Sequence, residues 1–267
     1  MPAPLFDLLR GARTTALRTL GPFDFVARAL SGRRHLPPLW LRRHAGPVSK
    51  FETSANETAA LIHQMALLRP GDRVLDIGCG PGAMALELAR RLGPQGRYVG
   101  FDVHQSSIRW CRRRFAGDLR LRFEVADVST PYSPRSGGRP EAIRFPAEEG
   151  SVDLAIAKSI FTHLLEAEAA RYLGEIRRVL APGRAAFVTA FLFEKTGATP
   201  LFPRPDGLAA VRWRSRARPR AAVAYDRLRF QAMIEEAGLR LRGMCAGFWP
   251  GDTAAMRGQD ILILEGI

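Results

Sequence analysis

Two aspartates, one before and one after a glycine-rich turn, are the residues whose spacing points most directly to ligand binding. Asp76 lies in an apolar run, Val74 to Ile77, and the turn Gly78 to Gly82 follows at once. A carboxylate in such a run is costly to bury unless a polar ligand, water or backbone donors satisfy it. Asp102 comes 20 residues after Gly82, the distance at which an acid in this type of unit reaches ribose hydroxyls. The alternative for Asp102 is a helix cap.

The glycine turn is ambiguous by itself, because Gly78, Gly80 and Ala83 also fit the dinucleotide-binding fingerprint. A carboxylate at Asp76 would repel a pyrophosphate and would attract a cationic amino-acid ligand. Glycines also let the backbone approach a ligand where no Cβ would fit. With these features the stretch Val74-Leu75-Asp76-Ile77-Gly78-Cys79-Gly80-Pro81-Gly82 resembles motif I of the class I S-adenosylmethionine-dependent methyltransferases, whose pattern is close to V-L-D-x-G-C-G-P-G.

The resemblance implies that residues at the ends of the strands bind S-adenosylmethionine, with S-adenosylhomocysteine as the product. They are Asp76, Gly78, Cys79, Gly80 and Gly82 at the first strand, Asp102 and Val103 at the second, Ala126, Asp127 and Val128 at the third, and Lys158 at the fourth. In the resembled family an acid at the position of Asp127 meets the adenine amino group. The alternative for Asp127 is a simple turn residue.

Polar residues after the fourth strand are the candidates for catalysis, because ligands of α/β sheets lie at the carboxyl ends of the strands. His163 is the only histidine placed there, which makes it the first candidate for a general base. The alternative is a hydrogen bond from His163 to a neighbouring loop. Ser159 and Tyr225 are further candidates. A base is needed only if the acceptor arrives protonated, since methyl transfer by direct displacement mostly requires alignment and exclusion of water.

An alternation of strands and helices must position these residues. Apolar runs predict strands over 74–77, 98–102, 121–125, 152–157 and 185–192, and helices over 83–92 and 166–179. Helix caps are expected at Ser54 in a capping box with Glu57, at Ser106 or Ser107, and at Asp226. Two strands, 239–246 and 259–264, end the chain without a crossover helix between them. The expected fold is therefore α/β, a Rossmann-like, seven-stranded, mostly parallel sheet with a C-terminal antiparallel hairpin and an N-terminal helical lid.

The chain divides at Gly46-Pro47 into a short basic segment and a large domain. Residues 1–47 are expected to be a helical lid or docking segment, although a transit peptide or a membrane-surface helix has the same composition. Residues 48–267 are expected to form the methyltransferase domain. The part at 194–224, rich in proline and arginine, is expected to be an irregular basic insertion.

The formal net charge of +14 is concentrated in two places. Residues 1–50 hold nine Lys and Arg against two acids, and residues 200–242 hold ten Arg against four acids. Two basic flaps over one site would focus a positive potential on it. This predicts an anionic acceptor, such as a phosphorylated, carboxylated or carrier-linked molecule, or one presented by peripheral contact at an acidic membrane surface. The alternative is that these arginines are solvated faces of a protein from a GC-rich genome.

The predicted function is transfer of a methyl group from S-adenosylmethionine to an oxygen or nitrogen of a small-molecule acceptor. Further stretches resemble a bacterial subset associated with natural-product or surface-glycan modification: Ile108-Arg109-Trp110-Cys111, Tyr132-Ser133-Pro134, Ser159 to His163, Ala222 to Asp226, and Gly247-Phe248-Trp249 with Gln259-Asp260.

Two other functional classes are alternatives. The first is a methyltransferase that binds nucleic acid through its Arg-rich segments; against it, the arginine run lacks the interleaved aromatic residues on which bases stack. The second is a non-catalytic S-adenosylmethionine-binding module, which the intact motifs disfavour.

Three cysteines without C-x-x-C spacing argue against a disulfide framework and a zinc site. The longest strongly apolar run, 185–193, is too short to span a bilayer. We therefore expect no metal ion and a cytoplasmic location.

Overall fold

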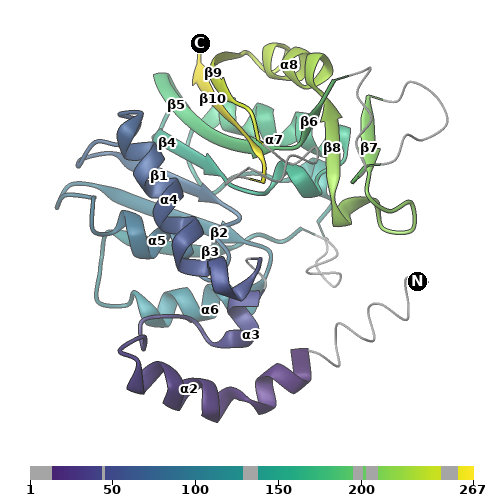
Figure 1. Cartoon of the computed structure of the whole chain (residues 1–267). Helices are drawn as coiled ribbons and strands as arrows, with labels where there is room; N and C mark the ends of the chain where they lie inside the picture. Colours follow the sequence, from purple (N-terminus) through teal and green to yellow (C-terminus); the bar gives the residue numbers. More distant parts are fainter. Residues whose placement is uncertain (1–13, 44–45, 129–137, 195–200, 203–209, 248–257) are drawn as a thin grey trace.

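The apolar runs that end in polar residues form the strands of one central sheet. The computed structural model describes residues 14–43, 46–128, 138–194, 201–202, 210–247 and 258–267. The strands are β1 (Arg73–Ile77), β2 (Arg97–Asp102), β3 (Leu121–Val125), β4 (Val152–Ala157), β5 (Leu180–Ala190), β9 (Leu239–Cys245) and β10 (Asp260–Gly266). Their order is β3-β2-β1-β4-β5-β10-β9, parallel from β3 to β5, with β10 antiparallel to both of its neighbours (Figure 1). The predicted Rossmann-like sheet with its C-terminal antiparallel pair is confirmed.

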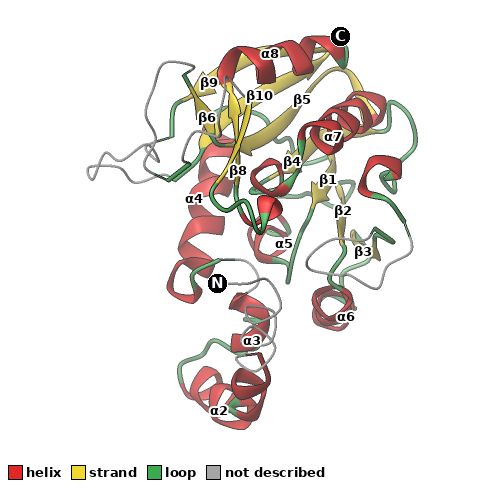
Figure 2. Cartoon of the chain, turned by 90° about the vertical axis from the view of Figure 1, so that its right-hand side faces the viewer, coloured by secondary structure: helices red, strands yellow, loops and turns green. Residues whose placement is uncertain are grey.

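Helices cover both faces of the sheet, because successive side chains of a buried strand point to opposite faces. Val74 joins the cluster formed with α4 (Phe51–Gln64), α5 (Ala83–Leu88) and α6 (Gln105–Arg114). Leu75 joins the cluster formed with α7 (Glu166–Val179) and α8 (Arg227–Glu236). Figure 2 shows the resulting layers, with the sheet between α4 and α7.

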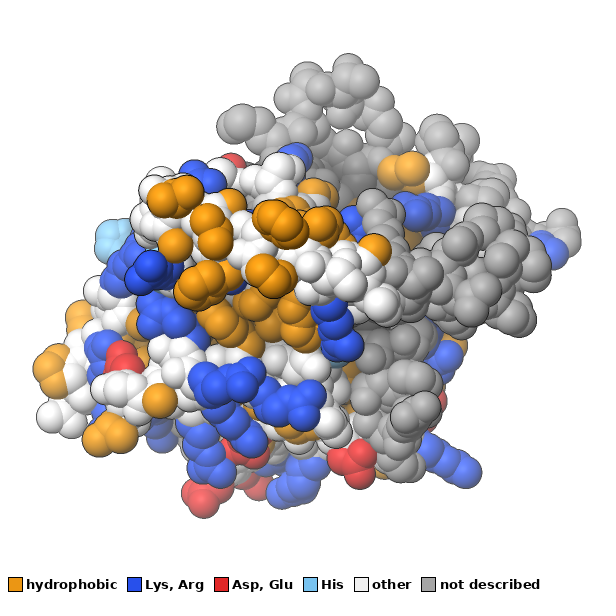
Figure 3. Space-filling view, turned by 90° about the horizontal axis from the view of Figure 1, so that it is seen from below, with side chains coloured by type: hydrophobic (Ala, Val, Ile, Leu, Met, Phe, Trp, Pro, Cys, Tyr) orange, Lys and Arg blue, Asp and Glu red, His pale blue; other side chains and the backbone are white. Residues whose placement is uncertain are grey.

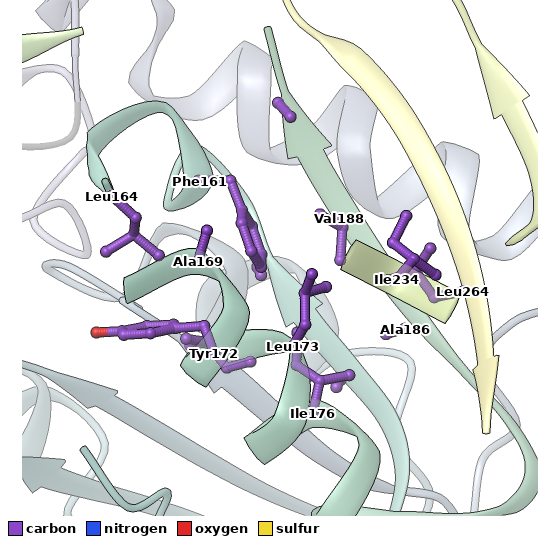
Figure 4. Close-up of a cluster of buried hydrophobic side chains, with 14 of the residues drawn as sticks. Phe161, Leu164, Ala169, Tyr172, Leu173, Ile176, Ala186, Val188, Ile234 and Leu264 are labelled. Atoms are coloured by element: carbon purple, nitrogen blue, oxygen red, sulfur yellow. The ribbon is translucent and has the colours of Figure 1, made fainter. Parts of the chain in front are cut away.

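The cluster on the α7 side holds the carboxyl end of β4 rigidly. Phe161, Leu173 and Ile176 are fully buried there (Figure 4). Full burial of one such side chain contributes about 1.5–3 kcal/mol relative to leaving it exposed. The short 3₁₀ turn η4 (Phe161–His163), which follows β4, is anchored by the Phe161 side chain. The packing of Phe161 therefore fixes the position of the turn that carries His163.

Two of the three predicted helix caps are wrong. Helix α4 begins at Phe51, directly after the 3₁₀ turn η2 (Val48–Lys50), so Ser54 lies inside its first turns. Helix α6 begins after His104, and Ser107 lies inside it with its Oγ 2.8 Å from His104 Nδ1. The cap at Asp226 is confirmed, because its side chain accepts a hydrogen bond from the Arg229 amide.

The insertion predicted to be irregular, 194–224, contributes to a small sheet that begins just before it and ends just after it. Its strands are β6 (Leu192–Phe193), β7 (Val211–Trp213) and β8 (Val223–Asp226), in the order β6-β8-β7, with the 3₁₀ turn η5 (Pro219–Ala221) before β8. The strands have two to four residues each, too few to give a clear alternating pattern. Tyr225 in β8 is fully buried, so packing stabilises strands that the sequence pattern did not reveal.

The described part of the N-terminal segment forms α2 (Gly21–Leu30) and α3 (Leu39–Arg42). They lie at the end of the molecule farthest from α8 (Figures 1 and 2). The Arg114 Nε of α6 donates to the carbonyl of His35, which links the segment to the domain. The role as a lid stays a prediction. In the described part of the chain no helix is both long and apolar enough to cross a membrane.

Two stretches on which the resemblance to a bacterial subset is based, Tyr132-Ser133-Pro134 and Phe248-Trp249, lie outside the described residues.

Candidate active site

A cavity of about 470 Å³ opens at the carboxyl ends of β1, β2 and β4. This is the position where α/β sheets bind their ligands, and the volume is that of a small-molecule site. The cavity brings together ten of the residues predicted from sequence: Asp76, Gly78, Cys79, Gly80, Asp102, Val103, Ala126, Lys158, Ser159 and His163. Residues that are up to 87 positions apart thus share one wall, because parallel strands end at the same edge of the sheet.

Gly78, Gly80 and Gly82 all have left-handed φ angles, of 71°, 52° and 79°. Gly80 and Gly82 are nevertheless needed for different reasons. A Cβ on Gly80 would meet nothing within 4 Å, because this residue lines the cavity. A Cβ on Gly82 would lie 3.0 Å from Cys111 Sγ. Gly82 does not line the cavity and instead allows α5 and α6 to pack closely. The open space at Gly80 is the cradle that a bound cofactor requires.

Asp102 ties the glycine turn to the end of β2. Its Oδ2 accepts from the Gly80 amide at 2.8 Å, and its Oδ1 accepts from the His104 amide at 2.8 Å. Burial raises the pKa of the Asp102 carboxyl, and these backbone donors counteract that rise. Each carboxylate oxygen has a second lone pair for a ligand hydroxyl. The carboxylate therefore supports the next helix, as a cap would, and still faces the cavity.

A buried carboxylate and a partly buried ammonium line the same cavity. Asp76 is 2% exposed, and the Tyr98 hydroxyl donates to its Oδ2 at 2.5 Å. Burial raises the pKa of Asp76 to about 7, while Tyr98 and the Lys158 ammonium lower it. Burial also lowers the pKa of Lys158, whose Nζ donates to the Ser54 carbonyl at 3.1 Å and to its Oγ at 2.8 Å. The Asp76 carboxylate suits the ammonium of an amino-acid group, and the Lys158 ammonium suits its carboxylate.

His163 lines the same cavity, next to an ion pair. Its Nδ1 is 2.9 Å from the Arg220 carbonyl, which only accepts, so Nδ1 carries the proton and the lone pair of the neutral ring is on Nε2. Glu168 of α7 accepts from Arg220 Nε at 2.9 Å and from Nη2 at 2.5 Å. Its Oε2 also accepts from the Leu165 amide. Glu168 and Arg220 line the cavity, and neither was identified from sequence.

Ser159 is held in a conformation that non-glycine residues rarely adopt, with φ at 59°. Its amide donates to Thr189 Oγ1 at 2.8 Å, and Gln259 Nε2 donates to its Oγ at 3.0 Å. Thr189 Oγ1 in turn donates to Gln259 Oε1 at 2.6 Å. Strain of this kind persists where the surrounding contacts enforce it, and it clusters at functional sites. Gln259, which lies directly before the last strand and 100 residues after Ser159, also lines the cavity.

Tyr225 is not part of the cavity, which corrects its prediction as a catalytic residue. Its side chain is fully buried, and its hydroxyl lies 2.6 Å from the Leu164 carbonyl and 2.9 Å from the Phe161 carbonyl. Burial raises the pKa of Tyr225 well above its ordinary value. An acceptor in the cavity cannot reach this hydroxyl, which instead fixes the turn that carries His163.

Asp127 and Val128 line an adjoining cavity of about 200 Å³. It shares Phe101 and Ala126 with the larger cavity. The two residues are thus next to the main cavity, and their contact with adenine stays a prediction.

Residues 74–183 match the family model described as a methyltransferase domain. A 37.1 kDa protein in transposon TN4556 of Streptomyces fradiae is 33% identical over 141 residues, which are 51% of this chain and 36% of that protein. The ubiquinone/menaquinone biosynthesis C-methyltransferase UbiE of Bordetella avium is 34% identical over 143 residues, 53% of this chain and 48% of that protein. The chain therefore spans less than half the length of these two curated relatives.

A solved structure has a similar fold over the whole chain. The 1,6-didemethyltoxoflavin-N1-methyltransferase of Burkholderia thailandensis, with bound 1,6-didemethyltoxoflavin and S-adenosylhomocysteine, has a TM-score of 0.56. It is 16% identical, and the match covers 100% of this chain and 90% of that one. This likeness concerns the fold.

Proposed function

Residues 74–183 are a class I S-adenosylmethionine-dependent methyltransferase domain, and from that premise we propose that the protein methylates an oxygen or nitrogen of an anionic small molecule. The resemblance drawn from the glycine turn is confirmed, and with it the cofactor, S-adenosylmethionine. When bound, this cofactor supplies an electrophilic methyl group on a sulfonium. The observation that carries the proposal is one cavity lined by two groups of residues. Asp76, Asp102 and Lys158 are groups of the type that bind the cofactor and are called the cofactor end below; His163, Glu168 and Arg220 are called the acceptor end.

The residues of the cofactor end fit each part of the cofactor. Asp76 would bind the amino group, Lys158 the carboxylate and Asp102 the ribose hydroxyls. The apolar side chains of Val103 and Ala126 line the same cavity. No side chain at Gly80 competes for this space.

The base we propose is Nε2 of His163. The Arg220 carbonyl keeps the proton on Nδ1, which leaves Nε2 to accept a proton from an acceptor hydroxyl or amine. The surrounding Leu164 and Tyr172 are largely buried and line the cavity, so they help to exclude water. This role applies when the acceptor arrives protonated.

An anionic acceptor is proposed because cationic groups line the cavity. Arg220 uses Nε and Nη2 for Glu168, and its Nη1 makes neither of these contacts. Its side chain is 34% exposed, whereas that of Glu168 is 1% exposed, so an entering molecule meets the guanidinium before the carboxylate. Lys50 lines the cavity as well and is exposed. A planar guanidinium held in place is suited to a carboxylate or phosphate.

A small molecule is favoured by the names of two similar proteins. The Bordetella avium relative is named for quinone biosynthesis, and the Burkholderia thailandensis structure for 1,6-didemethyltoxoflavin. Both names refer to small-molecule acceptors. Secondary metabolism or glycan modification as the pathway stays a prediction.

The test has two stages. Isothermal titration should detect S-adenosylmethionine binding, and formation of S-adenosylhomocysteine should then be followed with acceptors supplied in pairs, with and without a carboxylate or phosphate. We expect turnover with the anionic member of a pair. Absence of cofactor binding would overturn the whole proposal, turnover with RNA alone would favour the nucleic-acid alternative, and equal kcat/KM within the pairs would remove the anionic class.

The Arg220→Gln variant tests the contact itself. We expect the KM for the anionic acceptor to rise by about tenfold or more, since a charge-assisted hydrogen bond is lost. The affinity for S-adenosylmethionine should not change. Arg242→Gln is the control, because Arg242 is exposed on β9 and does not line the cavity. An equal KM in both variants would show that Arg220 makes no acceptor contact.

A further inference from the structure

Helix α2 presents an apolar face to the outside of the molecule. Leu20 just before it and Phe23, Val26 and Leu30 within it are 48%, 75%, 53% and 85% exposed. Their spacing of three and four residues places them on one side of the helix. Figure 3 shows apolar side chains gathered on this lower face of the molecule. Single exposed apolar residues are common, but a continuous group of this kind marks an interaction site.

The opposite side of α2 fixes the direction of this apolar face. Asp24, whose side chain is 8% exposed, accepts from Arg28 Nε at 2.9 Å, from Arg42 Nη2 at 2.8 Å and from the Leu39 amide at 3.1 Å. Arg28 Nη1 also donates to the Leu36 carbonyl at 2.8 Å. The helix is therefore attached by a buried polar network, and its apolar face is held outward.

Arginines surround the apolar face. Arg18, Arg33, Arg34 and Arg43 are exposed in the same segment, and α6, which contacts the segment through Arg114, carries further exposed arginines. Figure 3 shows Lys and Arg side chains near the apolar ones on this side of the molecule. Within residues 14–43 Asp24 is the sole acid, and it forms ion pairs with Arg28 and Arg42. One rim arginine, Arg33, has an acid nearby, with its Nε 4.0 Å from Glu52. The face has an apolar centre and a strongly cationic rim.

These two properties together select the partner. An anionic lipid surface offers acyl chains to the apolar side chains and phosphate groups to the arginines at the same time. A nucleic acid would satisfy the arginines and leave the phenylalanine and leucines exposed. A second copy of the chain would bring two arginine rims against each other. We propose that α2 binds an anionic lipid membrane, with Phe23 and Leu30 inserted and the rim arginines on the headgroups. The proposal is independent of the methyltransferase activity.

Vesicle co-sedimentation of the full chain tests the proposal. The probes are phosphatidylcholine vesicles with and without phosphatidylserine. We expect binding to the anionic vesicles, weaker binding at high salt, and a loss of about tenfold or more in the partition coefficient for Phe23→Ser with Leu30→Ser. The control is Leu228→Ser, because Leu228 is 65% exposed on α8, at the far end of the molecule. Circular dichroism checks that each variant is folded.

A second measurement does not depend on removing the apolar side chains. In Phe23→Trp, a blue shift of the added tryptophan fluorescence on mixing with anionic vesicles is expected if this position enters the bilayer. The proposal would be overturned by absence of binding to anionic vesicles, by binding that the double substitution leaves intact, or by absence of the blue shift. Conversion of a dimer to a monomer by the double substitution, without vesicle binding, would assign the face to a second copy.

Discussion

At the scale of single residues, the environment of Asp76 decides how the cofactor end of the cavity responds to pH. Burial raises the pKa of Asp76 to about 7, so this carboxyl is protonated below that value and charged above it. A charged carboxylate attracts the cofactor ammonium. We expect the affinity for S-adenosylmethionine to decrease as the pH falls through about 7, measured by isothermal titration at several pH values.

The Asp76→Asn variant separates binding from stability. It should bind the cofactor more weakly than the wild type above pH 7 and should lose the pH dependence. The folded-state pKa of Asp76, about 7, lies above the ordinary value of 3.8. Between these two pH values the folded wild type binds more protons than the unfolded chain, so its free energy of unfolding falls as the pH rises. The variant lacks this fall, so above pH 7 it should be about 1–3 kcal/mol more stable in urea unfolding. Asp153→Asn, at a surface ion pair with Arg73, is the control for affinity. Unchanged cofactor binding in Asp76→Asn would refute the assignment.

The role of His163 can be tested with a variant that keeps its hydrogen bond. In His163→Asn the amide nitrogen can still donate to the Arg220 carbonyl, as Nδ1 does, but the basic Nε2 is absent. If His163 is the base, kcat should fall by about 10²–10⁴-fold in this variant with cofactor affinity kept. A near-normal kcat in His163→Asn, together with a defect in His163→Ala, would make His163 a positioning residue.

At the scale of elements, the turn between β1 and α5 separates ligand binding from packing. Gly80→Ala and Gly82→Ala both place a Cβ at a left-handed φ, which costs about 1–2 kcal/mol of unfolding free energy each. In Gly82→Ala the Cβ would also lie 3.0 Å from Cys111 Sγ and 3.2 Å from the Phe115 ring, so this variant should be the less stable of the two. Gly80→Ala should instead lose about tenfold or more in cofactor affinity, because its methyl group enters the cavity. Titration and urea unfolding of both variants check this pattern, and the reverse pattern would contradict it.

The small sheet of the insertion is the element that completes the acceptor end. Tyr225 binds the carbonyls of Phe161 and Leu164, and Arg220 binds Glu168 of α7. His163 Nδ1 donates to the Arg220 carbonyl. These contacts join η5 and β8 to η4 and α7, so the segment that carries Arg220 is held by several hydrogen bonds at once.

At the scale of the whole molecule, the net charge of +14 should influence how an acceptor arrives. Screening shortens the reach of exposed charges to about 8 Å at physiological ionic strength. We therefore expect the acceptor KM to rise severalfold between low and physiological ionic strength, and to rise similarly when Arg214, Arg216 and Arg218 are replaced by glutamine. The affinity for S-adenosylmethionine should stay constant, which initial-rate and titration measurements would check. A KM that responds to neither change would leave no steering role for these arginines.

The sequence alone determined the sheet, and it located the residues that we propose for the cofactor end of the cavity. The glycine turn, Asp76 and Asp102 follow from short-range rules, because a strand, a tight turn and a helix are contiguous, and the strand spacing fixes where the second acid lies. The positions of Lys158, Ser159 and His163 follow in the same way from the end of β4. Cap positions were less reliable, since Ser54 bonds Lys158, 104 residues away, instead of its own helix end.

The acceptor end was decided by the tertiary structure. Glu168 meets Arg220, 52 residues on, and Ser159 meets Gln259, 100 residues on. Tyr225, expected at the site, is buried behind it. No local pattern encodes such pairs, because their distances depend on how the small sheet and the last strand pack against the central sheet. Packing is set by the burial of many apolar side chains at once, so these contacts exist only in the folded chain.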